Sequence, residues 1–262
     1  ACSGAPNKQS VSLPLNDQGR AVQLQKGIAL HEQAQSLFDQ GRYAEALDPA
    51  KETVAIRERT LGPTHEDLAS SLTLLGLIHH QRTELALAKP LLERALAIHE
   101  SISGPTDPKT AESLTNLARV LYADGEFTRA SQLLDRSLQL RDRALGKSHP
   151  DVGVTLMHLG IVRRVMRNFS AAGAAADQAV AILQTAGTAR RTDLATALSV
   201  KGSILALTGN YEAARPILQE SLQLREQALG LDHPHTARSV TQLGMLEEKM
   251  GNYQSAMRLF EP

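Results

Sequence analysis

Apolar positions follow a helical period along most of the chain. Between residues 66 and 81 the large apolar side chains recur at spacings of three and four: Leu68, Leu72, Leu75 and Ile78. This spacing puts them on one face of an α-helix, and residues 84–101 show a similar pattern. The sequence therefore predicts two amphipathic helices joined by a short turn.

This helix pair returns every 42 residues without insertion or deletion. The turn inside the pair is marked by glycine or asparagine with an aromatic residue, in Gln40–Leu47, Ala123–Ala130, Asn168-Phe169, Gly209–Tyr211 and Gly251–Tyr253. A second marker is a Leu-Gly or Leu-Ala pair, as in Leu75-Gly76, Leu117-Ala118, Leu159-Gly160 and Leu243-Gly244. One helix pair cannot bury its own apolar face, so neighbouring pairs must stack. We therefore expect an all-α, superhelical solenoid of about six antiparallel helix pairs.

The two ends of the sequence depart from the repeat. Residues 1–19 carry no repeat marker and contain Gly4, Pro6, Pro14 and Gly19, so we expect a flexible linker there and the solenoid over residues 20–262. The last copy of the second helix begins near Asn252, and Pro262 comes about six residues before earlier copies end. We therefore expect a truncated last repeat in a sequence cut from a longer chain.

The fourth repeat is also unusual. Its second helix is rich in alanine and contains Gly173, and Arg190-Arg191 replaces the His-Pro of other connectors. Glycine inside a helix costs up to about 1 kcal/mol relative to alanine, so either a neighbouring element packs closely against Gly173 or this is the flexible point of the solenoid. We favour close packing, because the surrounding alanines are themselves small.

The composition of the chain argues against two classes of protein, nucleic-acid binders and membrane-spanning proteins. The 28 Lys and Arg residues balance the 28 Asp and Glu residues, and aromatic residues make up 3% of the 262-residue chain. Nucleic-acid binders usually show a basic excess or aromatic stacking platforms, so we expect no nucleic-acid partner. No apolar run approaches the eighteen or so residues of a membrane span.

The only cysteine, Cys2, follows Ala1 and precedes a polar stretch. A small residue before such a cysteine resembles the lipidation junction of a bacterial lipoprotein. On that interpretation Cys2 carries a lipid tether and the protein lies in the bacterial cell envelope. The alternative is an ordinary terminus of a cytoplasmic protein.

The Gly-Lys-Ser sequence at residues 146–148 ends like a phosphate-binding loop. Such a loop needs an earlier glycine, where this chain has Arg141, and a preceding strand, where this chain predicts a helix. A glycine recurs at the same point of other repeats, as Gly62, Gly104 and Gly230. We therefore interpret Gly146 as a left-handed helix C-cap, followed by His149 as N-cap and Pro150 in the first turn of the next helix.

The remaining chemistry motifs are incomplete. His31-Glu32 begins an H-E-x-x-H zinc pattern, but Gln35 takes the place of the second histidine. His79 and His80 are adjacent, so on a helix they point about 100° apart. No Ser/His/Asp arrangement is recognisable, and we expect no metal site, no cofactor and no catalytic centre.

The period, both markers and the connectors "ALGKSHPDV" and "ALGLDHPHTA" resemble the tetratricopeptide repeats (TPR) of kinesin light chains, over about residues 20–262. Similar repeats occur in bacterial proteins, some of which add a CHAT-type protease or an ATPase domain. The resemblance implies a right-handed, non-catalytic solenoid whose concave groove, lined by the first helix of each pair, binds a partner protein or peptide.

The resemblance also implies groove residues. Asn116, in Leu-Thr-Asn-Leu-Ala, matches the groove asparagine of kinesin light chains, whose amide can hydrogen-bond a peptide backbone. The other expected contacts are Arg119, Tyr122, His158, Arg164, Arg238 and Gln242. Because Arg119, Arg164 and His158 fall in the middle of the groove, we hypothesise that the partner carries an acidic segment.

Two alternative functions stay open. The solenoid can be the sensor or recruitment arm of an enzyme, with a CHAT-type protease or ATPase domain beyond Pro262. It can also be an envelope lipoprotein that scaffolds an assembly.

Overall fold

The computed structural model describes residues 17–104 and 107–260. Within these ranges the chain forms twelve α-helices and one 3-10 helix. In order they are α1 (Asp17–Asp39), α2 (Tyr43–Leu61), α3 (Glu66–Gln81), α4 (Leu85–Ser103), α5 (Pro108–Ala123), α6 (Phe127–Leu145), α7 (Pro150–Val165), α8 (Phe169–Thr185), η1 (Thr188–Arg190), α9 (Arg191–Leu207), α10 (Tyr211–Leu229), α11 (Pro234–Lys249) and α12 (Tyr253–Phe260).

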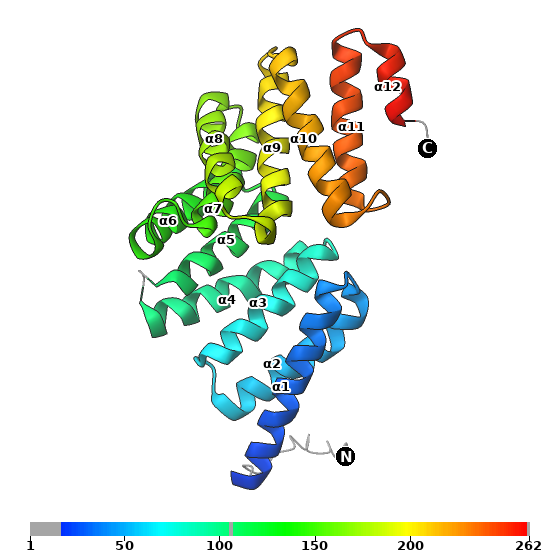
Figure 1. The fold of residues 1–262 in the computed structure, drawn as a ribbon. Coiled ribbons are helices and arrows are strands. Elements are labelled where there is room, and N and C mark those ends of the chain that lie inside the picture. The colour runs from blue at the N-terminus through cyan, green and yellow to red at the C-terminus, as the bar shows by residue number, and fades with distance from the viewer. Residues whose placement is uncertain (1–16, 105–106, 261–262) are drawn as a thin grey trace, which may run out of the picture.

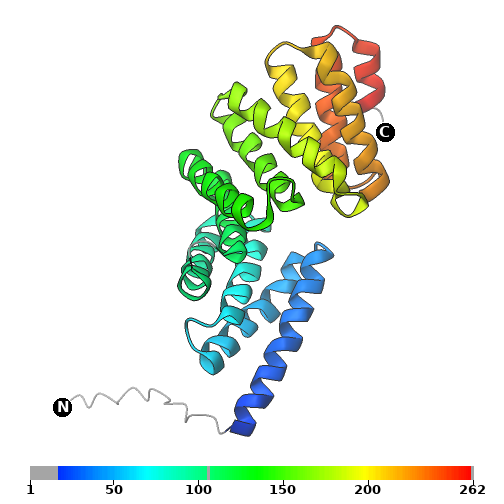
Figure 2. The same cartoon turned by 60° about the vertical axis from the view of Figure 1, so that its left-hand side comes forward.

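Successive helices form antiparallel pairs that stack in chain order, from α1 and α2 at one end to α11 and α12 at the other (Figure 1). The stack turns as it advances, which a second view makes plain (Figure 2). We call the first helix of each pair the A helix and the second the B helix. The core lies between their apolar faces, where Leu68, Leu72 and Ile78 are fully buried. The expected all-α superhelical solenoid is confirmed.

Helix α1 begins at Asp17, so residues 17–19 are helical rather than part of the expected linker. Residues 1–16, which include Cys2, lie outside the described residues, as does Pro262.

The glycine that follows four of the B helices has a positive φ, but it is not in the left-handed helical region. Gly62, Gly104, Gly146 and Gly230 have φ of 83–93° and ψ of 151–172°. The prediction of a left-handed C-cap is therefore wrong, because positive φ with extended ψ is a separate conformation that essentially only glycine adopts. The next residues are as predicted: Pro150 begins α7, and the Asp151 N–H donates to Nδ1 of the N-cap His149 over 3.2 Å.

The turn between the A and B helices of a pair also needs a positive φ. Glycine supplies it at Gly41, Gly125, Gly209 and Gly251, whereas the second and fourth pairs use Thr83 and Arg167, each with φ of 60°. A β-branched residue in this region is a conformational outlier, because its Cβ clashes with the backbone.

Replacing Thr83 by glycine should therefore stabilise the protein, by about 0.5–1 kcal/mol after allowance for the greater freedom of glycine in the unfolded chain. Urea unfolding of the variant measures the change. Thr64→Gly, in a turn where φ is not positive, is the matched control and should lower the free energy of unfolding. A Thr83→Gly variant no more stable than the parent would contradict the expectation.

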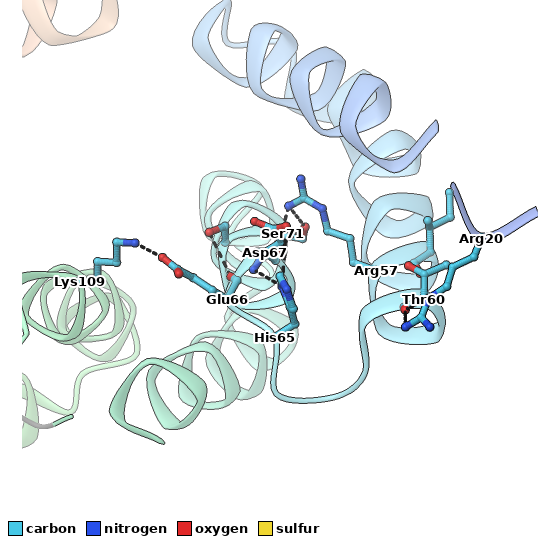
Figure 3. Close-up of polar contacts among 10 residues, drawn as sticks. Arg20, Arg57, Thr60, His65, Glu66, Asp67, Ser71 and Lys109 are labelled. Atoms are coloured by element: carbon cyan, nitrogen blue, oxygen red, sulfur yellow. Dashed lines mark hydrogen bonds and ion pairs between the residues drawn. The ribbon is translucent and has the colours of Figure 1, made fainter. Parts of the chain in front are cut away.

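At three of the junctions between a B helix and the next A helix, a buried arginine on the B helix binds the A helix. In the first, Arg57 Nη1 on α2 donates to the Asp67 carbonyl (2.7 Å) and to Ser71 Oγ (2.8 Å) on α3 (Figure 3). Arg141 makes the same two bonds to α7, and Arg225 makes them to α11. At the junction of α4 and α5, His99 Nδ1 lies 2.7 Å from Ser113 Oγ. We call each of these contacts a junction tether.

The junction between α8 and α9 has no such tether. The residues one period along from Arg141 and Thr155 are Leu183 and Ala197, and both are buried. An apolar pair therefore replaces the arginine and the hydroxyl at the centre of this interface. The connector also differs, because it contains the 3-10 helix η1.

Close packing at Gly173, which we expected from the sequence, is absent. The nearest atom to a Cβ built at this position is Ile204 Cγ2 at 3.9 Å, an ordinary van der Waals distance. Gly173 therefore weakens α8 without a packing reason.

Gly173→Ala should accordingly raise the free energy of unfolding by about 0.5–1 kcal/mol, because alanine is the better helix former and its methyl group has room. Differential scanning calorimetry provides the measurement. In Gly202→Ala, by contrast, the new Cβ would lie 2.6 Å from the Leu218 side chain. That control should melt at a lower temperature than the parent, and a Gly173→Ala variant that also does so would refute this interpretation.

Candidate functional site

Three depressions lie along the A helices of the solenoid. The first, of about 380 Å³, is lined by α1, α3 and α5 together with His99 of α4. The second, of about 230 Å³, lies between α3, α5, α6 and α7. The third, of about 220 Å³, is lined by α7, α9, α10 and α11. The groove expected from the sequence therefore consists of separate hollows with different chemistry.

The first depression is polar and contains Asn116. Glu66 and Lys109 form an ion pair at its wall, and His31 and Glu112 also line it. Asn116 is only 8% exposed, and its Oδ1 lies 3.5 Å from Arg119 Nη1. The asparagine thus presents a small part of its amide to the groove rather than a freely extended side chain.

The second depression brings together Arg119, Tyr122 and His158, three of the residues predicted for the groove, and adds His80. We call it the Arg119 pocket. Its other lining residues are apolar: Ala118, Ala123, Leu134, Ile161 and Val162. Tyr122 is held at the rim by a tilted ring contact with Phe127, with centroids 5.7 Å apart.

Both histidines of the Arg119 pocket are driven toward their neutral form. Burial lowers the pKa of His158 to about 3, with Arg119 and then Arg141 adding to the effect. Burial, followed by Arg119, also lowers the pKa of His80. His158 therefore adds no positive charge to the groove near neutral pH, which corrects the hypothesis that counted it with the two arginines.

The third depression contains Arg164 and Gln242, again from the predicted set. Gln242 already links two A helices, because its Oε1 accepts from Ser199 Oγ (2.5 Å) and its Nε2 donates to Ser203 Oγ (3.1 Å). Arg164 has a buried Nε without a hydrogen-bond partner among the described residues. Arg238 lines none of these three depressions and is exposed on α11.

Several arginines on the B helices pair with glutamates, whereas Arg119 and Arg164 form no ion pair with any described residue. Arg94 binds Glu58 (2.6 Å), Arg129 binds Glu93 (2.8 Å) and Arg136 binds Glu100 (2.6 Å), each joining neighbouring B helices. No carboxylate in the described part of the chain lies within ion-pair distance of Arg119 or Arg164. Two of the hollows along the A helices therefore each contain an arginine without a carboxylate partner among the described residues.

The described residues offer little for other chemistry. No group of three or more His, Cys, Asp and Glu residues within them can hold a metal ion. No helix in residues 17–104 or 107–260 is long and apolar enough to cross a membrane.

Models of known protein families match most of the repeats. One tetratricopeptide repeat model covers residues 25–101 and 193–261, and a second covers residues 110–151. A search of curated protein sequences finds no match to the chain.

Several solved structures share the fold. A protein from Podospora anserina described as a kinesin light chain with nearly identical TPR-like repeats is 21% identical over 77% of this chain and 95% of its own, with a TM-score of 0.62. BtubC (BKLC) from P. vanneervenii is 19% identical over 83% and 95%, with a TM-score of 0.59. A Rap protein complexed with Competence and Sporulation Factor is 12% identical over 90% and 73%, with a TM-score of 0.67. At these identities the likeness concerns the fold.

Proposed function

Because the chain belongs to the tetratricopeptide repeat family, with repeats like those of kinesin light chains, we propose that it is a non-catalytic scaffold whose A-helix groove binds one particular partner protein or peptide. Folds of this kind generally serve as interaction scaffolds. The observation that carries the proposal here is the row of three depressions along the A helices, two of which contain an arginine without a carboxylate partner among the described residues.

The unpaired arginines favour a partner with an acidic segment. A guanidinium with no protein carboxylate nearby gains charge-assisted hydrogen bonds when an anionic side chain arrives. Arg119 and Arg164 lie on successive A helices, α5 and α7. An extended segment with neighbouring carboxylates suits such an arrangement better than a single charge does.

The double substitution Arg119→Glu and Arg164→Glu tests this partner class. The probe is a fluorescent peptide with a central run of glutamates, and a peptide with glutamines in their place serves as its comparison. We expect the glutamate peptide to bind the parent protein at least about tenfold more tightly than the glutamine peptide, which corresponds to about 1.4 kcal/mol. The double variant should lose that preference, as measured by fluorescence anisotropy at low ionic strength.

The matched control is Arg143→Glu with Arg258→Glu, which makes the same change of charge on exposed positions of α6 and α12. It should keep the preference to within a factor of about two. If both double variants lost the preference for the glutamate peptide equally, net charge alone rather than the groove would attract the peptide. That result would contradict the acidic-segment proposal.

The two other interpretations, a recruitment arm of an enzyme and an envelope lipoprotein, concern sequence beyond Pro262 and before Ala1. Both interpretations remain predictions, and so does the lipidation of Cys2.

A further inference from the structure

The Arg119 pocket combines one unpaired cation with apolar walls. Arg119 is half-buried, and its contact with Asn116 Oδ1 is long, at 3.5 Å. A guanidinium has five N–H donors, so most of them have no acceptor among the described residues. The carboxylate with an electrostatic effect on Arg119 is Asp193, which is itself bound to Arg190 at 3.2 Å. Arg119 is thus available to a ligand.

The two histidines beside Arg119 add hydrogen-bonding capacity without charge. A neutral imidazole has one N–H donor and one acceptor nitrogen, and His80 Nδ1 is buried with no hydrogen-bond partner in the part of the chain that the structure describes. His80 comes from α3 and His158 from α7, while Arg119 and Tyr122 come from α5 between them. Polar groups of three helices therefore converge on one hollow.

The remaining walls and the size of the pocket limit what can enter. Leu134, Ile161 and Val162 present an apolar surface, which favours a hydrocarbon body over a second polar group. At about 230 Å³, the hollow is smaller than the roughly 300–1,000 Å³ typical of pockets for drug-sized ligands. A dianion such as a phosphate would place two charges against a single cation and apolar walls, which is costly. One negative charge is the better match.

We propose that the Arg119 pocket is a binding site for a monocarboxylate carried on a short apolar body, with the carboxylate on Arg119 and the apolar body against Ile161 and Leu134. The site takes one carboxylate on an apolar body rather than an acidic segment, so the inference goes beyond the proposed scaffold function. The same chemistry can arrive as a free short-chain acid or as the C-terminal leucine of a polypeptide.

The test is an NMR titration of the nitrogen-15-labelled protein with hexanoate and with hexanamide, followed through the amide shifts of α5 and α7. A second arm uses acetyl-Ala-Leu with a free carboxylate and the same dipeptide as its amide. We expect one or both acids to bind with a dissociation constant at least about tenfold below that of the matching amide. A response to hexanoate identifies a free acid as the ligand, and a response to the dipeptide acid alone identifies a polypeptide terminus.

Variants separate the pocket from the rest of the groove. Arg119→Gln should weaken acid binding at least about tenfold, and Ile161→Phe, which fills the pocket and keeps the cation, should weaken it as well. Arg143→Gln, at an exposed position of α6 outside the three depressions, should leave it within about twofold. The comparison of acid with amide needs only the parent protein, so it stays decisive even where a variant fails to fold. Equal binding of acid and amide, or no binding of either acid, overturns the proposal.

Discussion

Arg141→Ala is expected to destabilise the solenoid by about 3 kcal/mol. Arg141 is buried, and its Nη1 donates to the Asp151 carbonyl and to Thr155 Oγ1 over 2.8 and 2.7 Å. Hydrogen bonds from a charged group contribute about 1.5–3 kcal/mol, and truncation also leaves a cavity between α6 and α7. The measurement is the free energy of unfolding from a urea titration.

The chain offers its own control for this experiment. Leu183 and Ala197 occupy the equivalent positions at the junction of α8 and α9, so the double variant Arg141→Leu with Thr155→Ala copies a pair that already works elsewhere. It should recover at least half of the stability lost in Arg141→Ala, because an apolar pair fills the space and leaves no charge to desolvate. Arg143→Ala, on the exposed side of α6, should change stability by less than about 0.5 kcal/mol. A loss below about 1 kcal/mol in Arg141→Ala would mean that the junction tether is not important.

Acidification from pH 7 to pH 5 should cost the fold about 2 kcal/mol through His158 alone. The pKa of His158 is lowered to about 3 in the folded protein, whereas an unfolded histidine titrates near 6.5. Above pH 6.5 both states are neutral, so the group has little effect there. Below pH 6.5 His158 is protonated in the unfolded chain but stays neutral in the folded chain. The free energy of unfolding therefore falls as pH decreases toward 3.

His158→Asn isolates this contribution, because asparagine is the residue at the equivalent position of α5, Asn116. The difference in unfolding free energy between parent and variant should move by about 2 kcal/mol in favour of the variant between pH 7 and pH 5. His31, His80 and His99 have lowered pKa values too, so the variant keeps some dependence of its own. If the free energy of unfolding changed with pH in the same way in both proteins, His158 would not be the source of the acid destabilisation.

The repeat period predicts the helices well because every helix pair packs in the same way, so the same apolar positions recur in each pair. The predicted helix over residues 66–81 coincides with α3, and the N-cap role of His149 is as expected. Two of the errors concern glycine. The sequence shows a recurring glycine after four of the B helices but carries no information on its ψ, and it cannot show that the space around Gly173 is open.

The sequence also contains a signal that we did not use. Each junction arginine precedes a hydroxyl residue by fourteen positions, as with Arg57 and Ser71 or Arg225 and Ser239. The pair lies on two different helices, so a search for periodicity within one helix overlooks it.

The groove residues could be predicted only as positions on the A helices. Which of them share a hollow depends on how neighbouring pairs pack, and this places Arg119 with His158 but separates both from Arg164. Whether a side chain is free depends on its partners, and the amide of Gln242 is already bonded to α9.

The apolar centre of the junction between α8 and α9 has a consequence for behaviour in the cold. In a linear array of repeats, each joint is stabilised only by its two neighbours. Apolar burial becomes weaker on cooling, whereas the directional bonds of a junction tether do not share that dependence. As temperature falls, we therefore expect the central contact of this joint to weaken more than the junction tethers do, so that separation of the solenoid in the cold should begin between α8 and α9.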